Sequence, residues 1–262
     1  MYDHIINFRN RLDSGESLIG TVITSADPTT SDALADSVDF LWYDQEHSPM
    51  SPGALKTHLM AARGKGCPSL VRVTEGTTPF IKPVLDSGAC GVIAPQVKTV
   101  EEVRQVVTNC RYPNIGTRGS GALIPTNYYR MDGMLHAQKA NDAVFAAVMI
   151  ETSDAVEAID EIVAVPGLDS VVIGPVDLSG ALGVLGEIEH PKVIASIKKV
   201  VSSASAAGLY VGAGLGLDTN YALILSNLGV QWFQMGSDIN AMIHGMDSSI
   251  TDAKNKINKK IK

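Results

Sequence analysis

The stretch Phe145–Glu151, FAAVMIE, is an unbroken apolar run that ends in a carboxylate. A run this short, followed by the helix-start residues Thr152-Ser153, predicts a fully buried strand. A second run, Val171–Asp177 (VVIGPVD), ends in an acid in the same way. Between them, the segment Ser153–Val165 carries apolar residues at helical spacing. The sequence therefore predicts a strand–helix–strand unit whose two strands are parallel and adjacent.

The two acids that end these runs, Glu151 and Asp177, are predicted to lie close together, because the carboxyl ends of adjacent parallel strands meet at one edge. Burying two carboxylates there without a cation costs roughly several kcal/mol per charge, and a divalent metal between them removes that cost. Hard oxygen ligands without Cys or His favour Mg²⁺ and tolerate Mn²⁺ or Ca²⁺. The alternative is that each acid caps the helix that follows it.

Eight strand-like runs alternate with helical segments along the 262 residues, and no change of composition marks a domain boundary. This pattern predicts an α/β fold, a single-domain (β/α)₈ TIM barrel over residues 1–262 with its core at about 18–245. A doubly wound open sheet is the alternative, disfavoured because no glycine-rich phosphate-binding turn follows the first run. The predicted strands are 18–24, 40–43, 69–73, 92–94, 145–151, 171–177, 209–213 and 232–235. The predicted helices are 4–12, 30–37, 52–62, 80–87, 100–110, 128–140, 153–165, 192–207, 220–228 and a region beyond 238, and the longest irregular segment is 111–126.

Two further polar residues follow predicted strands, at the end where barrel enzymes build their active sites. Arg72 could hold the carboxylate of a 2-oxo acid in a bidentate fork. His47, in the loop 44–47, could act as a general base. Each could also be an ordinary solvated side chain, and the position at a strand end favours the functional interpretation.

Other residues beside the two acids are predicted to line the same site. Met149 lies two residues before Glu151, so the alternation of side chains along a strand points both to the same side. Gly174 and Pro175 predict a tight turn next to Asp177 whose backbone could grip a substrate carboxylate.

Composition restricts the partners and the compartment. The net charge is −7, and the last twelve residues (251–262) contribute +4 from five lysines and one aspartate, so the remainder carries −11. This balance argues against nucleic acid as a partner, and we expect the lysine-rich tail to be a solvated, frayed terminus. Three cysteines without metal-ligand spacing (Cys67, Cys90, Cys110) suit a reducing compartment. Without an apolar leader or a run long enough to span a membrane, the protein is predicted to be soluble and cytoplasmic.

Six motifs, in this order, resemble the HpcH/HpaI family of metal-dependent class II aldolases. They are YDQEHSP (43–49), Arg72, APQV (94–97), RYPNIGTRGSG (111–121), MIET (149–152) and GPVDLS (174–179). The resemblance covers about residues 18–242 and implies a (β/α)₈ barrel. It also implies a homo-oligomer, usually a hexamer, in which the last helix packs onto a neighbour. The apolar residues that follow the last predicted strand, within 232–246, suit such a contact.

The same resemblance implies roles for individual residues. His47 matches the catalytic base and Arg72 the anchor of the substrate carboxylate. Glu151 and Asp177 match the metal ligands. Two further residues take their roles from the resemblance alone. Asp86 matches an acid that orients the histidine, in some members across a subunit boundary, and Arg118 matches a residue that meets the second substrate.

Met149 departs from the family pattern, which has a glutamine beside the bound pyruvate. This change favours a branch that resembles the citrate synthase associated with the siderophore staphyloferrin B. There, oxaloacetate is the electrophile and acetyl-CoA supplies the attacking carbon, giving citrate and CoA for siderophore biosynthesis. The alternative is a class II aldolase that cleaves 4-hydroxy-2-oxo acids to pyruvate and an aldehyde. A third possibility, a barrel retained only for binding, is disfavoured by the presence of both carboxylates, Arg72 and His47.

Overall fold

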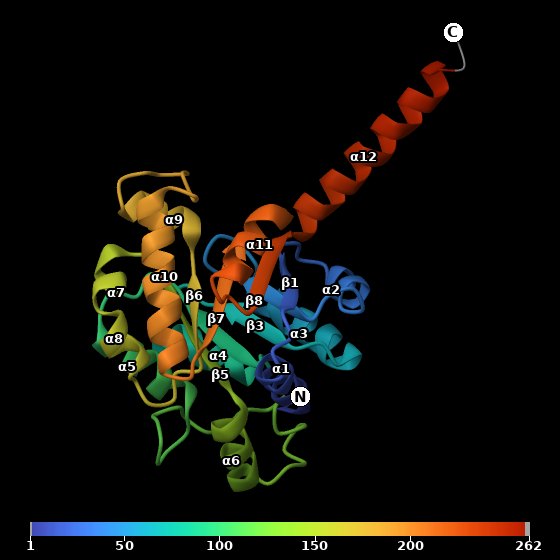
Figure 1. Cartoon of the computed structure of the whole chain (residues 1–262). Coiled ribbons are helices and arrows are strands. Elements are labelled where there is room, and N and C mark those ends of the chain that lie inside the picture. Colours follow the sequence, from blue (N-terminus) through green and yellow to red (C-terminus); the bar gives the residue numbers. More distant parts are fainter. Residues whose placement is uncertain (1, 260–262) are drawn as a thin grey trace.

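Eight parallel strands close into a barrel in the computed structural model, which describes residues 2–259 (Figure 1). Each strand pairs with the next along the chain, and β8 pairs back with β1. The predicted (β/α)₈ barrel is therefore confirmed, and the open doubly wound sheet is wrong. The strands are β1 Leu18–Ile23, β2 Phe40–Asp44, β3 Ser69–Arg72, β4 Gly91–Ala94, β5 Phe145–Ile150, β6 Ser170–Ile173, β7 Tyr210–Leu215 and β8 Trp232–Ser237.

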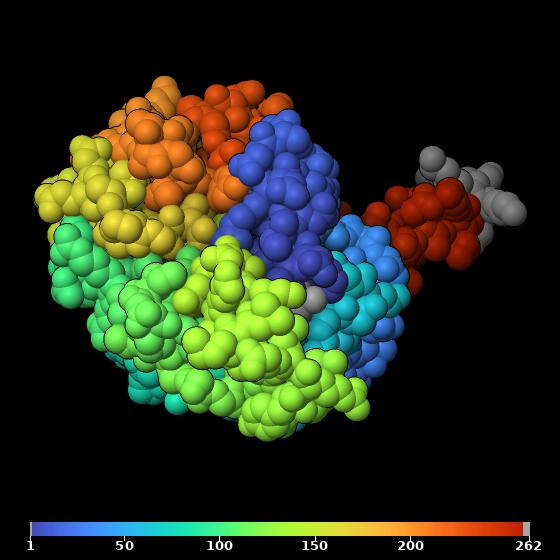
Figure 2. All heavy atoms as spheres, turned by 90° about the horizontal axis from the view of Figure 1, so that it is seen from below, coloured from blue at the N-terminus to red at the C-terminus, as the bar shows by residue number. Residues whose placement is uncertain are grey.

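Helices surround the barrel, and one helix closes its amino-terminal end. The helix α1 (Tyr2–Asp13) lies across that end, where Phe8 makes edge contacts with Phe40, Phe145 and Trp232. Figure 2 shows α1 in blue on this face, beside the green segment that includes α6. The other helices are α2 Thr29–Leu34, α3 Pro52–Lys65, α4 Thr78–Asp86, α5 Val100–Cys110, α6 Gly133–Ala143, α7 Ser153–Glu157, α8 Ile159–Val163, α9 Pro175–Ala181, α10 Pro191–Ala206, α11 Thr219–Asn227 and α12 Asp238–Lys259.

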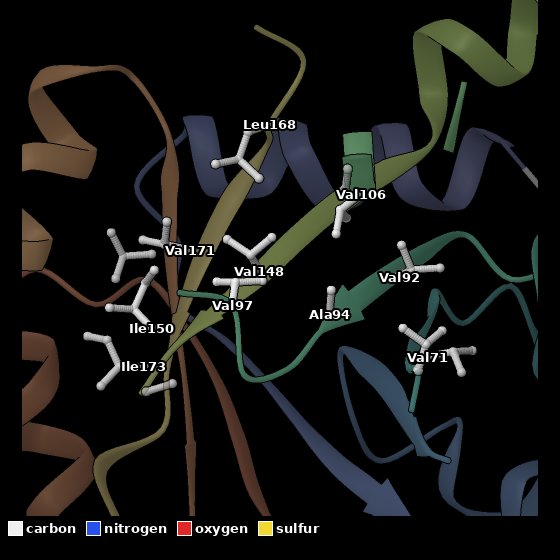
Figure 3. Packing of buried hydrophobic residues seen from close by; sticks show 14 of the residues in the cluster. Val71, Val92, Ala94, Val97, Val106, Val148, Ile150, Leu168, Val171 and Ile173 are labelled. Carbon is white, nitrogen blue, oxygen red and sulfur yellow. The ribbon is translucent and has the colours of Figure 1, made fainter. Parts of the chain in front are cut away.

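The strand β5 shows why the run FAAVMI has no polar residue. Its side chains alternate between two apolar environments: Val148 and Ile150 belong to the layer between strands and helices (Figure 3), whereas Phe145 and Met149 belong to the barrel interior. A strand buried on both faces needs apolar residues at every position. The same alternation turns Glu151, the next residue after β5, to the interior side with Met149.

Most boundaries differ from the predicted ones by a few residues, and three elements differ in kind or position. The predicted strand 171–177 is too long: β6 ends at Ile173 and α9 begins at Pro175, because proline at the first helical position suits a helix start. The predicted helix 128–140 is displaced to Gly133–Ala143, where the Asp132 side chain caps its first turn. The predicted helix 153–165 is two short helices, α7 and α8, separated at Ala158.

The C-terminal segment is longer and more regular than predicted. The helix α12 runs from Asp238 to Lys259 and projects away from the barrel (Figure 1). Residues 251–258 are solvent-exposed as expected, but they are helical, so the frayed terminus is wrong for this part. Lys260 and Lys262 of the predicted tail lie outside the described residues. No helix within residues 2–259 is long and apolar enough to cross a membrane. The homo-oligomer, the cytoplasmic location and the absence of nucleic acid partners stay predictions.

Candidate functional site

Glu151 follows β5 directly and is almost completely buried, with 2% of its surface exposed. One carboxylate oxygen, Oε1, accepts two hydrogen bonds from Gln96, from its backbone N–H at 2.7 Å and from its side-chain amide at 3.0 Å. Gln96 adopts φ +56°, a conformation that L-residues rarely occupy. Strained backbone of this kind persists where the surroundings hold it, often at functional sites. Gln96 thus fixes Glu151 at the cost of local strain.

Glycine at position 174 gives Glu151 the space that it occupies. A Cβ atom at Gly174 would lie 2.6 Å from Glu151 Oε2 and 3.2 Å from Met149 Cε. Gly174 precedes α9, and Asp177 lies in the first turn of that helix. The side chain of Asp177 is near enough to Glu151 to influence its titration. The charge of Asp177 thus acts on Glu151 at the same end of the barrel, although Asp177 comes from the first turn of a helix and not from a strand end.

The electrostatics around Glu151 fit a bound cation. Burial raises the pKa of Glu151 to about 7, and the negative charges of Asp177 and Glu46 add to this, against the opposing effects of the Gln96 backbone N–H and Arg72. A divalent cation between Glu151 and Asp177 would relieve this excess of negative charge, and both ligands are hard oxygens. Within residues 2–259, no group of three or more His, Cys, Asp or Glu side chains forms a ready metal site. If Glu151 and Asp177 are the protein ligands, the other coordination positions are left to water and substrate.

Helix capping does not explain both acids. Thr152, not Glu151, is the residue whose side chain caps α7. Asp177 does lie in the first turn of α9, where the helix dipole favours an anion. The capping alternative thus fits Asp177 in part and is wrong for Glu151.

Arg72, at the end of β3, is held by a residue that the sequence did not single out. Its Nε and Nη2 donate to the two oxygens of Asp44, at 2.9 and 2.7 Å. Burial alone would raise the pKa of Asp44, but these bonds outweigh it and hold the pKa below its usual value. One bidentate face of the guanidinium is therefore occupied by Asp44. A substrate carboxylate could be held only by the remaining Nη1–Nη2 edge.

Glu46 and His47 lie at the rim of the same site. Glu46 Oε2 is 3.1 Å from Arg72 Nη1 and 3.7 Å from His47 Nε2. The His47 side chain is 69% exposed, so a substrate can reach it. No role was predicted from the sequence for Glu46, Asp44 or Gln96. The first two lie in the motif YDQEHSP and the third in APQV.

A cavity of about 210 Å³ lies at the carboxyl ends of the strands, and Arg72, Met149 and Asp177 are among the residues that line it. Met149 lines it with its Sδ 3.9 Å from Arg72 Nη1, which agrees with the predicted direction of this side chain. The indole of Trp42 lies below Arg72, 5.8 Å from the guanidinium carbon to the ring centre. The full lining is Trp42, Arg72, Met149, Gly174, Pro175, Val176, Asp177, Gly214, Leu215, Gly216 and Gln234.

Asp86 and Arg118 lie elsewhere in the chain. Helix α4 starts after the carboxyl end of β3 and returns to the beginning of β4, so Asp86 at its last turn lies at the opposite end of the barrel. There Arg118 Nη2 donates to Asp86 Oδ1 at 2.8 Å, and its guanidinium covers the ring of Tyr112. Within one chain, these residues do not join the site of Glu151 and Arg72.

Comparisons with known proteins agree with this arrangement. A family model described as HpcH/HpaI aldolase/citrate lyase matches residues 22–245. The hydroxypyruvate/pyruvate aldolase of Roseovarius nubinhibens is 34% identical over 233 residues, which are 88% of this chain and 90% of that protein. A crystal structure of an HpcH/HpaI aldolase from Desulfitobacterium hafniense matches with a TM-score of 0.88 and 30% identity, covering 94% of this chain and 96% of the other. The crystal structure of citrate synthase SbnG matches with a TM-score of 0.84 and 30% identity, covering 95% and 98%.

Proposed function

Because the chain belongs to the HpcH/HpaI aldolase/citrate lyase family, we propose that it makes or breaks a carbon–carbon bond on a 2-oxo acid. The observation that carries this proposal is a cavity at the carboxyl end of the barrel that Arg72 and Asp177 line, together with the buried Glu151, whose pKa both of these charges influence. A divalent cation held by the two carboxylates, together with Arg72, would bind the keto and carboxylate oxygens of such a substrate.

Glu151 and Asp177 would hold a divalent cation, Mg²⁺ by preference, which supplies Lewis-acid chemistry at the substrate keto oxygen. Gln96 keeps the Glu151 carboxylate in place through its two hydrogen bonds. Arg72 is fixed by Asp44 and would donate from its Nη1–Nη2 edge to the substrate carboxylate. His47 is within reach of solvent and substrate and would move the proton of the reaction.

Citrate formation is the first candidate reaction. Met149 supports it, because a thioether, not an amide, stands beside Arg72, and the similarity to citrate synthase SbnG supports it independently. In this reaction His47 would take a proton from the methyl group of acetyl-CoA, and the resulting carbon nucleophile would attack the keto carbon of oxaloacetate. Hydrolysis of the thioester then releases citrate and CoA, for use in siderophore biosynthesis.

Aldol cleavage is the second candidate, and the similarity to a hydroxypyruvate/pyruvate aldolase favours it. Here His47 would take the proton of the 4-hydroxyl group of a 4-hydroxy-2-oxo acid. The bond between carbons 3 and 4 would break, giving an aldehyde and pyruvate. The same anchoring residues serve both reactions, since both substrates carry a 2-oxo acid group.

Asp86 and Arg118 would act in either reaction only if a neighbouring subunit brought them to the site. Their pairing at the other end of the barrel supports a role across a subunit boundary over one within the chain. This part of the proposal depends on the predicted homo-oligomer.

Two assays with Mg²⁺ test the proposal and separate the candidates. Citrate formation releases free CoA thiol only when oxaloacetate and acetyl-CoA are both present. Aldol cleavage releases pyruvate from hydroxy-oxo acids without any thioester. If neither product forms with a range of 2-oxo acids, the proposed carbon–carbon bond chemistry is wrong and a binding role takes its place.

A further inference from the structure

Two carboxylates already contact the guanidinium of Arg72 in this structure. An arginine offers five N–H donors. Asp44 takes one from Nε and one from Nη2, and Glu46 lies 3.1 Å from Nη1. A substrate carboxylate that uses the Nη1–Nη2 edge would therefore lie close to the carboxylate of Glu46, with two negative charges beside Nη1.

Glu46 also contacts the predicted base. The same oxygen, Oε2, that faces Arg72 Nη1 lies 3.7 Å from His47 Nε2. The Glu46 side chain is 16% exposed, whereas that of His47 is 69% exposed, so the carboxylate is the more fixed partner of the two. One carboxylate oxygen thus stands between the anchor for the substrate and the group that would move a proton.

The surroundings of Glu46 act on its carboxylate in opposite directions. Burial raises its pKa, and the nearby charges of Asp44 and Asp177 act in the same direction, while Arg72 and His47 oppose them. An anion held in such surroundings by one arginine nitrogen can be replaced there by another anion. Asp44 differs, because it holds two nitrogens of Arg72 and its pKa is lowered.

We propose that Glu46 is a positioning residue whose carboxylate occupies the Nη1 site of Arg72 until the carboxylate of a 2-oxo acid replaces it. Glu46 then pairs with His47 alone and holds the imidazole toward the substrate. Substrate binding at the anchor and alignment of the base are thereby coupled through one side chain. This inference rests on the proposed function. It adds a residue that couples binding of the substrate carboxylate to alignment of the base.

The substitution Glu46→Gln tests this coupling, because it removes the competing charge and keeps the shape. Oxalate is the probe for binding, since its oxygens resemble those of a 2-oxo acid. With Mg²⁺ present, calorimetry should show oxalate binding about 3- to 10-fold tighter in Glu46→Gln, the effect of losing one partly exposed competing ion pair. The KM of the 2-oxo acid should fall with it, whereas kcat should fall about 10-fold or more because His47 loses its partner.

Two further variants serve as controls for this test. Glu101→Gln removes an exposed carboxylate that pairs with Arg104 on the surface of α5, and it should change neither constant. Glu46→Asp keeps the charge on a shorter side chain that cannot reach both partners, so kcat should fall again. Thermal melting checks that each variant is folded.

Weaker or unchanged oxalate binding in Glu46→Gln overturns the proposal, and so does an unchanged kcat in both Glu46 variants. If the unmodified protein shows no Mg²⁺-dependent oxalate binding and no turnover, the proposed function itself fails. Tight binding by the unmodified protein with weaker binding by the variant removes only the role of Glu46.

Discussion

At the scale of single residues, the site depends on side chains that fix other side chains. Gln96 holds Glu151 from a strained backbone conformation, and Asp44 holds Arg72 through two bonds. Gly174 contributes by having no side chain. Residues of this kind lower the freedom of the groups that would touch a substrate, which is the usual requirement for accurate positioning.

Removal of metal should abolish activity. Excess chelator is expected to stop turnover and Mg²⁺ to restore it, because Glu151 and Asp177 are predicted to hold a divalent cation that binds the substrate keto oxygen. Mg²⁺ at about 100 times its Kd should also stabilise the folded protein by about 2.7 kcal/mol. Glu151→Gln should lose this shift in thermal melting. Full activity in excess chelator would contradict the prediction.

Gly174→Ala should damage activity far more than stability. The new Cβ would lie 2.6 Å from Glu151 Oε2, and Gln96 prevents an easy retreat of that carboxylate. We expect kcat/KM to fall about 10-fold or more, since a displacement of about 1 Å can cost two orders of magnitude. Gly64→Ala is the control: its Cβ meets nothing within 4 Å, and alanine in a helix should stabilise by about 0.5–1 kcal/mol.

Arg72→Lys isolates geometry from charge. Lysine keeps the positive charge but cannot reproduce the two parallel bonds to Asp44 or the Nη1–Nη2 edge of the guanidinium. A hydrogen bond to a charged group is worth about 1.5–3 kcal/mol, so KM for the 2-oxo acid should rise roughly 10- to 150-fold. Arg104→Lys at an exposed position should be silent. An unchanged KM in Arg72→Lys would show that Arg72 does not hold the substrate.

At the scale of elements, the start of α12 is tied to the end of β1 by one side chain. Asp238, in the first turn of α12, accepts hydrogen bonds from the backbone N–H groups of Thr24 and Ser25 and from the Thr24 hydroxyl. Burial would raise the pKa of Asp238, but these bonds outweigh it and lower the pKa. The carboxylate therefore anchors the helix that leaves the barrel.

Asp238→Asn should destabilise the protein in a pH-dependent way. A carboxyl group whose pKa is lowered by folding stabilises the folded state above its unfolded pKa, and this contribution is lost as the pH falls through the folded value. We expect a loss of about 1–2 kcal/mol near pH 7, in chemical unfolding. The difference between the two proteins should shrink as the pH falls below about 4.

The control for this prediction is Asp252→Asn in the same helix. Asp252 is exposed and pairs with Lys256 on the helix surface, so its loss should have little effect at any pH. A constant difference between Asp238→Asn and the unmodified protein from pH 7 to pH 3 would contradict the assignment.

At the scale of the whole molecule, α12 is exposed along its length. Its large apolar side chains Ile239, Met242, Ile243, Met246 and Ile250 are between 40% and 61% exposed. Helices in soluble proteins normally bury such a stripe. Asp86 and Arg118 also lie at the opposite end of the barrel from the site, so they do not reach the site of their own chain.

We therefore expect a homo-oligomer at micromolar concentration, a hexamer by the family resemblance. Light scattering should give a mass several times that of one chain, because burial of an apolar stripe favours association. The double substitution Met242→Lys and Met246→Lys should reduce that mass. The matched change Asn240→Lys on the same helix should not. A monomeric unmodified protein would contradict the prediction.

The sequence by itself determined the barrel architecture and the direction of the Glu151 side chain. Alternating apolar runs and helical spacings predict eight strand–helix units, since each unit must bury its strand on both faces. The direction of Glu151 and Met149 follows from the two-residue period of one strand. Both conclusions depend on residues that are close in the chain, where local geometry relates one side chain to the next.

Tertiary structure alone decided which groups hold the site in place. The contacts of Asp44 with Arg72 and of Gln96 with Glu151 join residues 28 and 55 positions apart, and no local pattern relates them. Asp177 was misplaced onto a strand because Pro175 starts a helix that the apolar run conceals. The pairing of Asp86 with Arg118 depends on where α4 and the segment after α5 end in space. Such contacts appear only when the barrel closes and brings the ends of separate strands and helices together.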